Sequence, residues 1–190
     1  MVKKYTDAQL LNKVKTLASF KNFPTDYWIL GVQSLEDVYN TFDDKFYLFK
    51  GQEFIMMSTG TTNAGANALL KYNTYNPTGY AVIKTNEWYY GVWKYGLHRG
   101  KMRALRQAKP FLISRDGDKD KKVEEGVSIP VMCGINFHTN TYALSAPEIK
   151  EIIGGHSLGC QVINNTEKYY KIIDLVQPQK IVTYCLIKEF

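Results

Sequence analysis

The chain has 190 residues, of which 45% are hydrophobic, and its formal net charge at pH 7 is +6. This length predicts a single domain, residues 1–190, with enough apolar content for a substantial core. No apolar run approaches the roughly 20 residues of a membrane-spanning helix, and the N-terminus leads into a polar helix, not into a signal peptide. The positive charge suits an anionic partner. Nucleic acid is disfavoured, because the basic residues form no stripe and no known binding module.

The first predicted element is an amphipathic helix over residues 5–20, with Thr6 or Asp7 as its N-cap. Helical spacing gives it one apolar stripe. The stripe consists of Leu10, Leu11, Val14, Leu17 and Ala18. Pro24 ends the segment, so we interpret residues 1–24 as an N-terminal helical extension and residues 25–190 as the main body of the domain.

Short apolar runs separated by turn residues predict about eight to ten strands and two or three helices, a mainly β or α+β fold. The clearest runs are 27–32, 46–49, 54–57, 80–83, 87–97, 110–114, 129–138 and 181–187. Segment 87–97 is rich in aromatic residues, which we expect in the core or on a sheet face; a sugar-stacking platform is the alternative.

A last helix is expected near the C-terminus, capped by Asn164 or Thr166 and ended by Pro178. Its apolar positions are Tyr169, Ile172, Ile173 and Val176.

Two polar stretches resemble functional loops. Residues 116–120 are similar to the start of a calcium-binding loop, but Lys121 and Val127 occupy the positions of its glycine and its last glutamate. We therefore expect a charged, solvated turn and no metal site. Thr59–Gly65 is small and polar, which predicts a loop.

Three cysteines without CxxC spacing argue against a disulfide scaffold and a cysteine-rich zinc site. Cys133 and Cys185 lie in apolar runs, so we expect both to be buried. Cys160 differs, because it lies in a turn of small residues, 22 positions after His138. A histidine at the end of an apolar strand can act as base for a cysteine nucleophile and stabilise its thiolate.

The stretch 134–162 resembles the catalytic domain of L,D-transpeptidases (YkuD type), in a phage-encoded form. The matching residues are His138, Ser157, Gly159 and Cys160. Three features differ from the family: the interval between histidine and cysteine is longer, Leu158 stands where a second histidine is common, and Val162 replaces an arginine. A weaker likeness extends to 59–65 and 96–98.

The resemblance implies a β-sandwich-like fold with a helix after the catalytic cysteine. It assigns Cys160 as nucleophile, His138 as general base and the Thr139 carbonyl as the group that orients the imidazole. The backbone N–H groups of Cys160 and Gly159 would form the oxyanion hole. Residues expected to contact substrate are Ser157, His156, His98, Thr61 and Thr62. Residues 139–155 are long enough to form a lid.

The implied reaction is acyl transfer on peptidoglycan stem peptides, without metal or cofactor. Water as acceptor gives carboxypeptidase or endopeptidase activity, which the phage-like form favours, and an amine gives transpeptidation. The implied location is the host cytoplasm with release to the cell wall at lysis, or the virion. Two alternatives remain: a zinc hydrolase using His98, His138 and His156, and a non-catalytic virion or cell-wall-binding protein that retains the fold.

Overall fold

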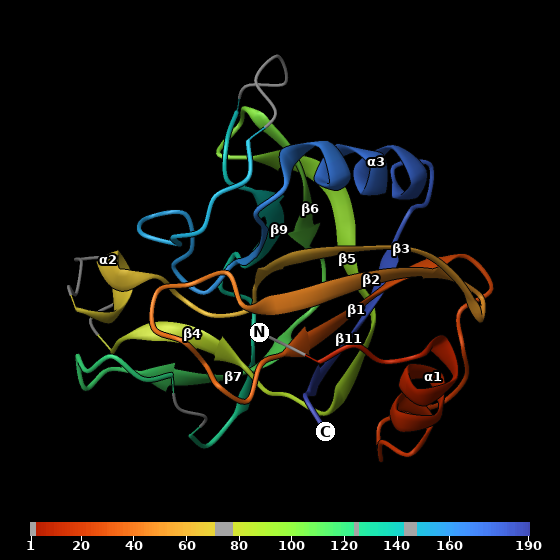
Figure 1. The fold of residues 1–190 in the computed structure, drawn as a ribbon, viewed down its shortest axis with the longest axis horizontal. Helices are drawn as coiled ribbons and strands as arrows, with labels where there is room; N and C mark the ends of the chain where they lie inside the picture. The colour runs from red at the N-terminus through yellow and green to blue at the C-terminus, as the bar shows by residue number, and fades with distance from the viewer. Residues whose placement is uncertain (1–2, 71–77, 124–125, 143–147) are drawn as a thin grey trace.

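The computed structural model describes residues 3–70, 78–123, 126–142 and 148–190. The protein is mainly β, as predicted, and eight of its strands form a closed barrel (Figure 1). In their order around the barrel they are β1 (Tyr27–Gln33), β11 (Val182–Lys188), β5 (Glu87–His98), β6 (Met102–Gln107), β9 (Asn136–Thr139), β10 (Gln161–Ile163), β3 (Glu53–Thr61) and β2 (Asp44–Lys50). The main sheet therefore closes on itself instead of forming the two facing sheets of a sandwich.

A smaller sheet lies beside the barrel (Figure 1). It contains β4 (Tyr80–Ile83), β7 (Phe111–Asp116) and β8 (Ile129–Val131), with β7 in the middle. The predicted strand 129–138 is thus two strands, since β8 joins the small sheet and β9 the barrel. Gly134, with φ of +78°, lies between them. A left-handed residue turns the chain sharply here, and glycine adopts this conformation without steric cost.

Other strand predictions need smaller corrections. β4 and β5 lie in different sheets, although only Lys84–Asn86 separates them. Residues 59–61 of the predicted loop continue β3, and the short helix α2 (Ala66–Leu69) follows that loop. Strand β10 was not predicted, because its three residues are too few to show a periodic pattern.

The helix α1 (Asp7–Lys15) covers part of the outer surface of the barrel. Thr6 caps it: the Thr6 hydroxyl accepts from Gln9 N (3.2 Å), and the Gln9 side chain accepts from Thr6 N (2.8 Å). Leu10 and Val14 are fully buried, in a cluster with Trp28 and other aromatic residues of the barrel wall. The helix is shorter than predicted and Ala18 is exposed.

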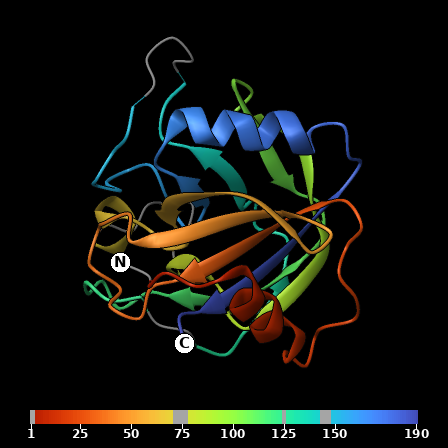
Figure 2. The ribbon, with the colours of Figure 1, turned by 45° about the vertical axis from the view of Figure 1, so that its right-hand side comes forward.

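The helix α3 (Thr166–Val176) packs on another side of the barrel (Figure 2). Its four predicted apolar positions are all buried. The cap is Asn165, whose side chain accepts from Lys168 N (2.9 Å), and not Asn164 or Thr166. The Asn164 side chain instead links Thr59 Oγ1 (2.6 Å) to the Lys150 carbonyl (2.8 Å). No helix within the described ranges is long and apolar enough to cross a membrane.

Candidate active site

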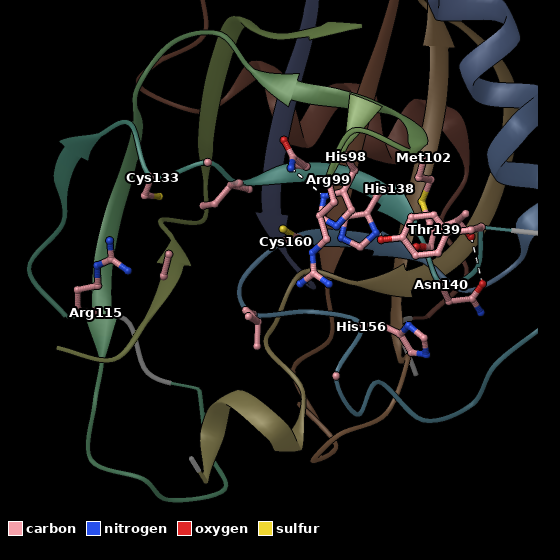
Figure 3. Close-up of a pocket in the computed structure, with 17 residues that line it drawn as sticks. His98, Arg99, Met102, Arg115, Cys133, His138, Thr139, Asn140, His156 and Cys160 are labelled. Carbon is pink, nitrogen blue, oxygen red and sulfur yellow. Dashed lines mark hydrogen bonds between the residues drawn. The ribbon is translucent and has the colours of Figure 1, made fainter. Parts of the chain in front are cut away.

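The parallel pairing of β9 with β10 brings the candidate nucleophile and base together. Gln161 pairs with Phe137 and Val162 with His138, so Cys160 immediately precedes β10 beside Asn136. Side chains alternate along a strand. Phe137 therefore points into the barrel core, whereas Asn136, His138 and Cys160 share the outer face. His138 and Cys160 both line one cavity of about 350 Å³ (Figure 3).

The cavity lies between the outer face of the barrel and the small sheet. The end of β5 contributes His98, the turn that follows contributes Arg99, and β7 contributes Arg115. Residues 155–158, which precede the cysteine, form a further wall that includes His156. Segments far from Cys160 in sequence, at 98–99 and at 115, thus lie around the same cavity as the thiol.

His138 is held as a neutral base. Its Nδ1 lies 2.7 Å from the Thr139 carbonyl oxygen. Because a carbonyl only accepts hydrogen bonds, Nδ1 carries the proton and Nε2 keeps a lone pair. Burial, together with the neighbouring His98, lowers the pKa of His138 to about 3. The imidazole is therefore uncharged at neutral pH and able to accept a proton.

The Cys160 thiol is also neutral at rest. Burial raises its pKa to about 11, although a hydrogen bond from the Asn136 backbone and the charge of Arg99 lower it in part. This differs from the expectation that the imidazole stabilises a thiolate. With a neutral thiol and a neutral imidazole, any reaction of this thiol as a nucleophile requires transfer of its proton.

Ser157 and Gly159 build the turn that presents Cys160. The Ser157 hydroxyl donates to the Cys160 carbonyl (2.8 Å) and accepts from Gly159 N (3.2 Å). Gly159 has φ of +106°, and a Cβ there would come within 2.5 Å of the Ala81 carbonyl oxygen of β4. Only glycine fits. Ser157 thus has a structural role instead of a substrate contact, and the Gly159 N–H is already bonded, contrary to the expected oxyanion hole.

Thr61 and Thr62 lie outside the cavity, against the expectation that they contact substrate. Both are buried. The Thr61 hydroxyl donates to the Asn63 carbonyl (3.1 Å), and that of Thr62 to the Asp44 carboxylate (2.8 Å). These bonds fix the end of β3, and they explain why two hydroxyl groups can be buried there.

His98 is not a solvated surface histidine but lines the cavity next to His138. Its ring stacks on that of His138, with centroids 4.1 Å apart and planes at 19°. Asn136 Nδ2 lies 2.9 Å from His98 Nδ1. The lone pair of an imidazole lies in the plane of its ring. Two nearly parallel, stacked rings therefore do not direct their lone pairs at one metal ion, which disfavours the zinc alternative. Among the described residues no group of three or more His, Cys, Asp or Glu could hold a metal ion.

Sequence reasoning missed several residues of the cavity, among them one further cysteine and two arginines. Cys133 is half-buried and lines the cavity, whereas we expected it to be buried; Cys185 is buried as predicted. Arg99 and Arg115 add positive charge to the walls. Arg99 directly follows His98, which was predicted. No sequence pattern marked Arg115 as a cavity residue, because only the contact between the two sheets brings it there.

The predicted lid, residues 139–155, includes 143–147, which lie outside the described residues. Its described C-terminal end is attached to the body of the protein. Phe42 N donates to the Glu151 carbonyl (3.2 Å), and Ile153 N to that of Asn40 (3.0 Å). This end is therefore anchored just before Gly155, which lines the cavity.

Comparison with protein-family models, curated proteins and solved structures gave no match.

Proposed function

We propose that the protein is a cysteine-dependent acyl-transfer enzyme of the L,D-transpeptidase (YkuD) type, and that it acts on peptidoglycan stem peptides. The observation that supports this best is the parallel register of β9 and β10. It sets a neutral imidazole, whose Nε2 carries the lone pair, on the same face and in the same cavity as a thiol. A thiol and a neutral imidazole are the two groups that nucleophilic catalysis by cysteine uses.

In the proposed reaction, Cys160 Sγ attacks the peptide carbonyl next to an L-centre. The thiol proton passes to His138 Nε2, the S–C bond forms, and the carbonyl π electrons move to oxygen. The C–N bond then breaks, and His138 returns the proton to the leaving amine of the D-residue. Water attacks the thioester in the second half of the reaction, which gives L,D-carboxypeptidase or endopeptidase activity; an amine acceptor would give transpeptidation.

The charge of the cavity supports a substrate with carboxylates. Arg99 and Arg115 line it, and no Asp or Glu is among its described lining residues. Guanidinium groups bind carboxylates well, often through two parallel hydrogen bonds. The family's arginine position holds Val162, which is fully buried against Phe42 and Ile153. We propose that Arg99, from the turn between β5 and β6, and Arg115, from β7, provide this charge instead.

A non-catalytic cell-wall-binding or virion protein is the second candidate. Two observations favour it: the pKa of Cys160 is raised to about 11, and the Gly159 N–H is bonded to Ser157. The first means that little thiolate is present at neutral pH, and the second that this N–H group already has an acceptor other than an oxyanion. In this case the cavity would bind the stem peptide without cleaving it.

The deciding experiment is mass spectrometry of defined stem peptides incubated with the wild type and with Cys160→Ala, His138→Ala and His156→Ala. We expect release of the terminal D-residue by the wild type and none by Cys160→Ala. His138→Ala should lose about 10²–10⁴-fold in rate, as for a positioned general base. His156→Ala is the control, because it removes a cavity histidine that is neither stacked on His138 nor next to it in the sheet.

The result that contradicts the proposal is a folded wild type that releases nothing and forms no thioester at Cys160. Retention on purified peptidoglycan would then identify the binding protein. A protein of either kind would reach its polymer on a virion or after lysis, and this location is part of the proposal.

A further inference from the structure

The candidate site lacks one of its expected oxyanion donors. A tetrahedral intermediate at the scissile carbonyl needs hydrogen-bond donors already aimed at its oxygen. Of the two backbone groups expected in the turn, the Gly159 N–H donates to Ser157 Oγ (3.2 Å). A donor from another element would make up for this loss.

His98 has a fixed tautomer that provides such a donor. Asn136 Nδ2 lies 2.9 Å from His98 Nδ1. An amide nitrogen only donates, so Nδ1 accepts and the ring proton is on Nε2. Burial and the adjacent Arg99 lower the pKa of His98 to about 4, so the ring is neutral at pH 7. His98 therefore carries one N–H group, in contrast to His138, whose Nε2 is an acceptor.

The stacking places this donor beside the base. The two rings lie 4.1 Å apart and nearly parallel, and both line the cavity that contains Cys160 (Figure 3). Asn136 also contacts the thiol through its backbone. Asn136 of β9 thus contacts the proposed nucleophile and orients His98. His138, the next outward-facing residue of the same strand, is the proposed base.

From this geometry we infer that His98 Nε2–H donates a hydrogen bond to the carbonyl oxygen under attack and stabilises the oxyanion during acylation of Cys160. This inference rests on the proposed function, and it makes His98 a catalytic residue instead of a substrate-binding one. No proton leaves His98. The negative charge forms on the carbonyl oxygen as the S–C bond forms, and it disappears when the C–N bond breaks.

Two variants of His98 distinguish the effect of its N–H donor from the effect of its stacked ring. His98→Phe keeps an aromatic ring to stack on His138 and removes the N–H group. His98→Gln keeps an N–H donor and removes the ring. If His98 only packs against His138, the phenylalanine variant is the better enzyme; if it donates, the glutamine variant is.

Two reagents distinguish an effect on oxyanion stabilisation from an effect on the reactivity of the Cys160 thiol. Acylation by 4-nitrophenyl acetate passes through a tetrahedral oxyanion, whereas alkylation by iodoacetamide does not. Both rates are measured at Cys160 by peptide mass spectrometry at pH 8, in variants whose cooperative unfolding is verified by circular dichroism. We expect His98→Phe to slow acylation by about 10²–10³-fold, as for loss of one oxyanion donor, and alkylation by less than about threefold. His98→Gln should be acylated at least about tenfold faster than His98→Phe.

The inference is overturned if His98→Phe acylates at the wild-type rate, or if it loses acylation and alkylation equally. Neither reagent resembles a stem peptide, so this result is independent of the substrate. A wild type that acylates at Cys160 in a His98-dependent way, but cleaves no stem peptide, would contradict the proposed substrate and leave the role of His98 intact. A wild type that never acylates at Cys160 would contradict the proposed function itself.

Discussion

At the scale of single residues, burial sets the protonation state of the candidate nucleophile and base. Removal from water favours the uncharged form of each group, which raises the pKa of a thiol and lowers that of an imidazole. The pKa of Cys160 is about 11 and that of His138 about 3. The resting pair is therefore neutral over the whole physiological range, so the proposed attack would have to be coupled to proton transfer.

This state predicts the pH dependence of Cys160 alkylation. Only the thiolate reacts with iodoacetamide, and below its pKa of about 11 the thiolate fraction grows tenfold with each pH unit. The alkylation rate should therefore rise about tenfold per unit between pH 7 and pH 10. Peptide mass spectrometry over this range measures it.

Cys185 is the internal control, because it is fully buried and should stay unmodified until the protein unfolds. A rate that reaches a plateau below pH 8 would contradict the prediction. It would show a thiolate–imidazolium pair formed before substrate binds.

At the scale of elements, α3 shows how a helix start is fixed by one side chain. The Asn165 side chain accepts a hydrogen bond from Lys168 N, which otherwise has no partner in the first turn. Asn164 and Thr166 flank it and have the same capping preference. Their side chains make other bonds: Asn164 to Lys150, and Thr166 to Asn140 and the Glu148 carbonyl.

We predict that Asn165→Ala lowers the free energy of unfolding by about 1 kcal/mol, the usual cost of losing an N-cap. Urea denaturation followed by circular dichroism measures this. Asn165→Asp is the matched control, since an aspartate retains the cap and favours the positive end of the helix dipole. Equal destabilisation by both variants would show that Asn165 contributes through a contact other than the cap.

At the scale of the whole molecule, the two ends of the chain meet on the barrel. The Tyr5 ring stacks on that of Phe190 (centroids 4.3 Å apart), and its hydroxyl donates to the Phe190 carbonyl (2.6 Å). The indole of Trp88 donates to the Val14 carbonyl (2.8 Å) at the C-terminal part of α1. The described part of the predicted N-terminal extension therefore packs as part of the fold.

This packing predicts that α1 unfolds together with the candidate site around Cys160. Leu10→Ala should lower the unfolding free energy by roughly 2–5 kcal/mol, since it leaves a cavity under the helix. Tryptophan fluorescence and the reactivity of Cys160 should change at the same denaturant concentration. Asn12→Ala, at an exposed position of the same helix, is the control and should change little. Exposure of Cys160 at a separate denaturant concentration would contradict a single cooperative unit.

The sequence by itself determined the local features of this protein. Short apolar runs predicted most strands, and helical spacing predicted both long helices, because these patterns reflect which side chains leave water. Thr6 and Asp7 were the predicted caps of α1, of which the structure shows Thr6, and the small residues around Cys160 indicated a tight turn. The mainly β class follows from the same signals.

Only the tertiary structure decided which elements lie side by side. Strands β8 and β9 are neighbours in sequence and belong to different sheets, while β9 and β10 are separated by a long connection and pair in parallel. That pairing sets His138 beside Cys160. The contact between the two sheets brings Arg115 into their cavity, and the hydrogen bonds at the end of β3 hold Thr61 and Thr62 outside it. Strand pairing depends on contacts between distant residues and on the packing of whole faces, which local propensity does not encode.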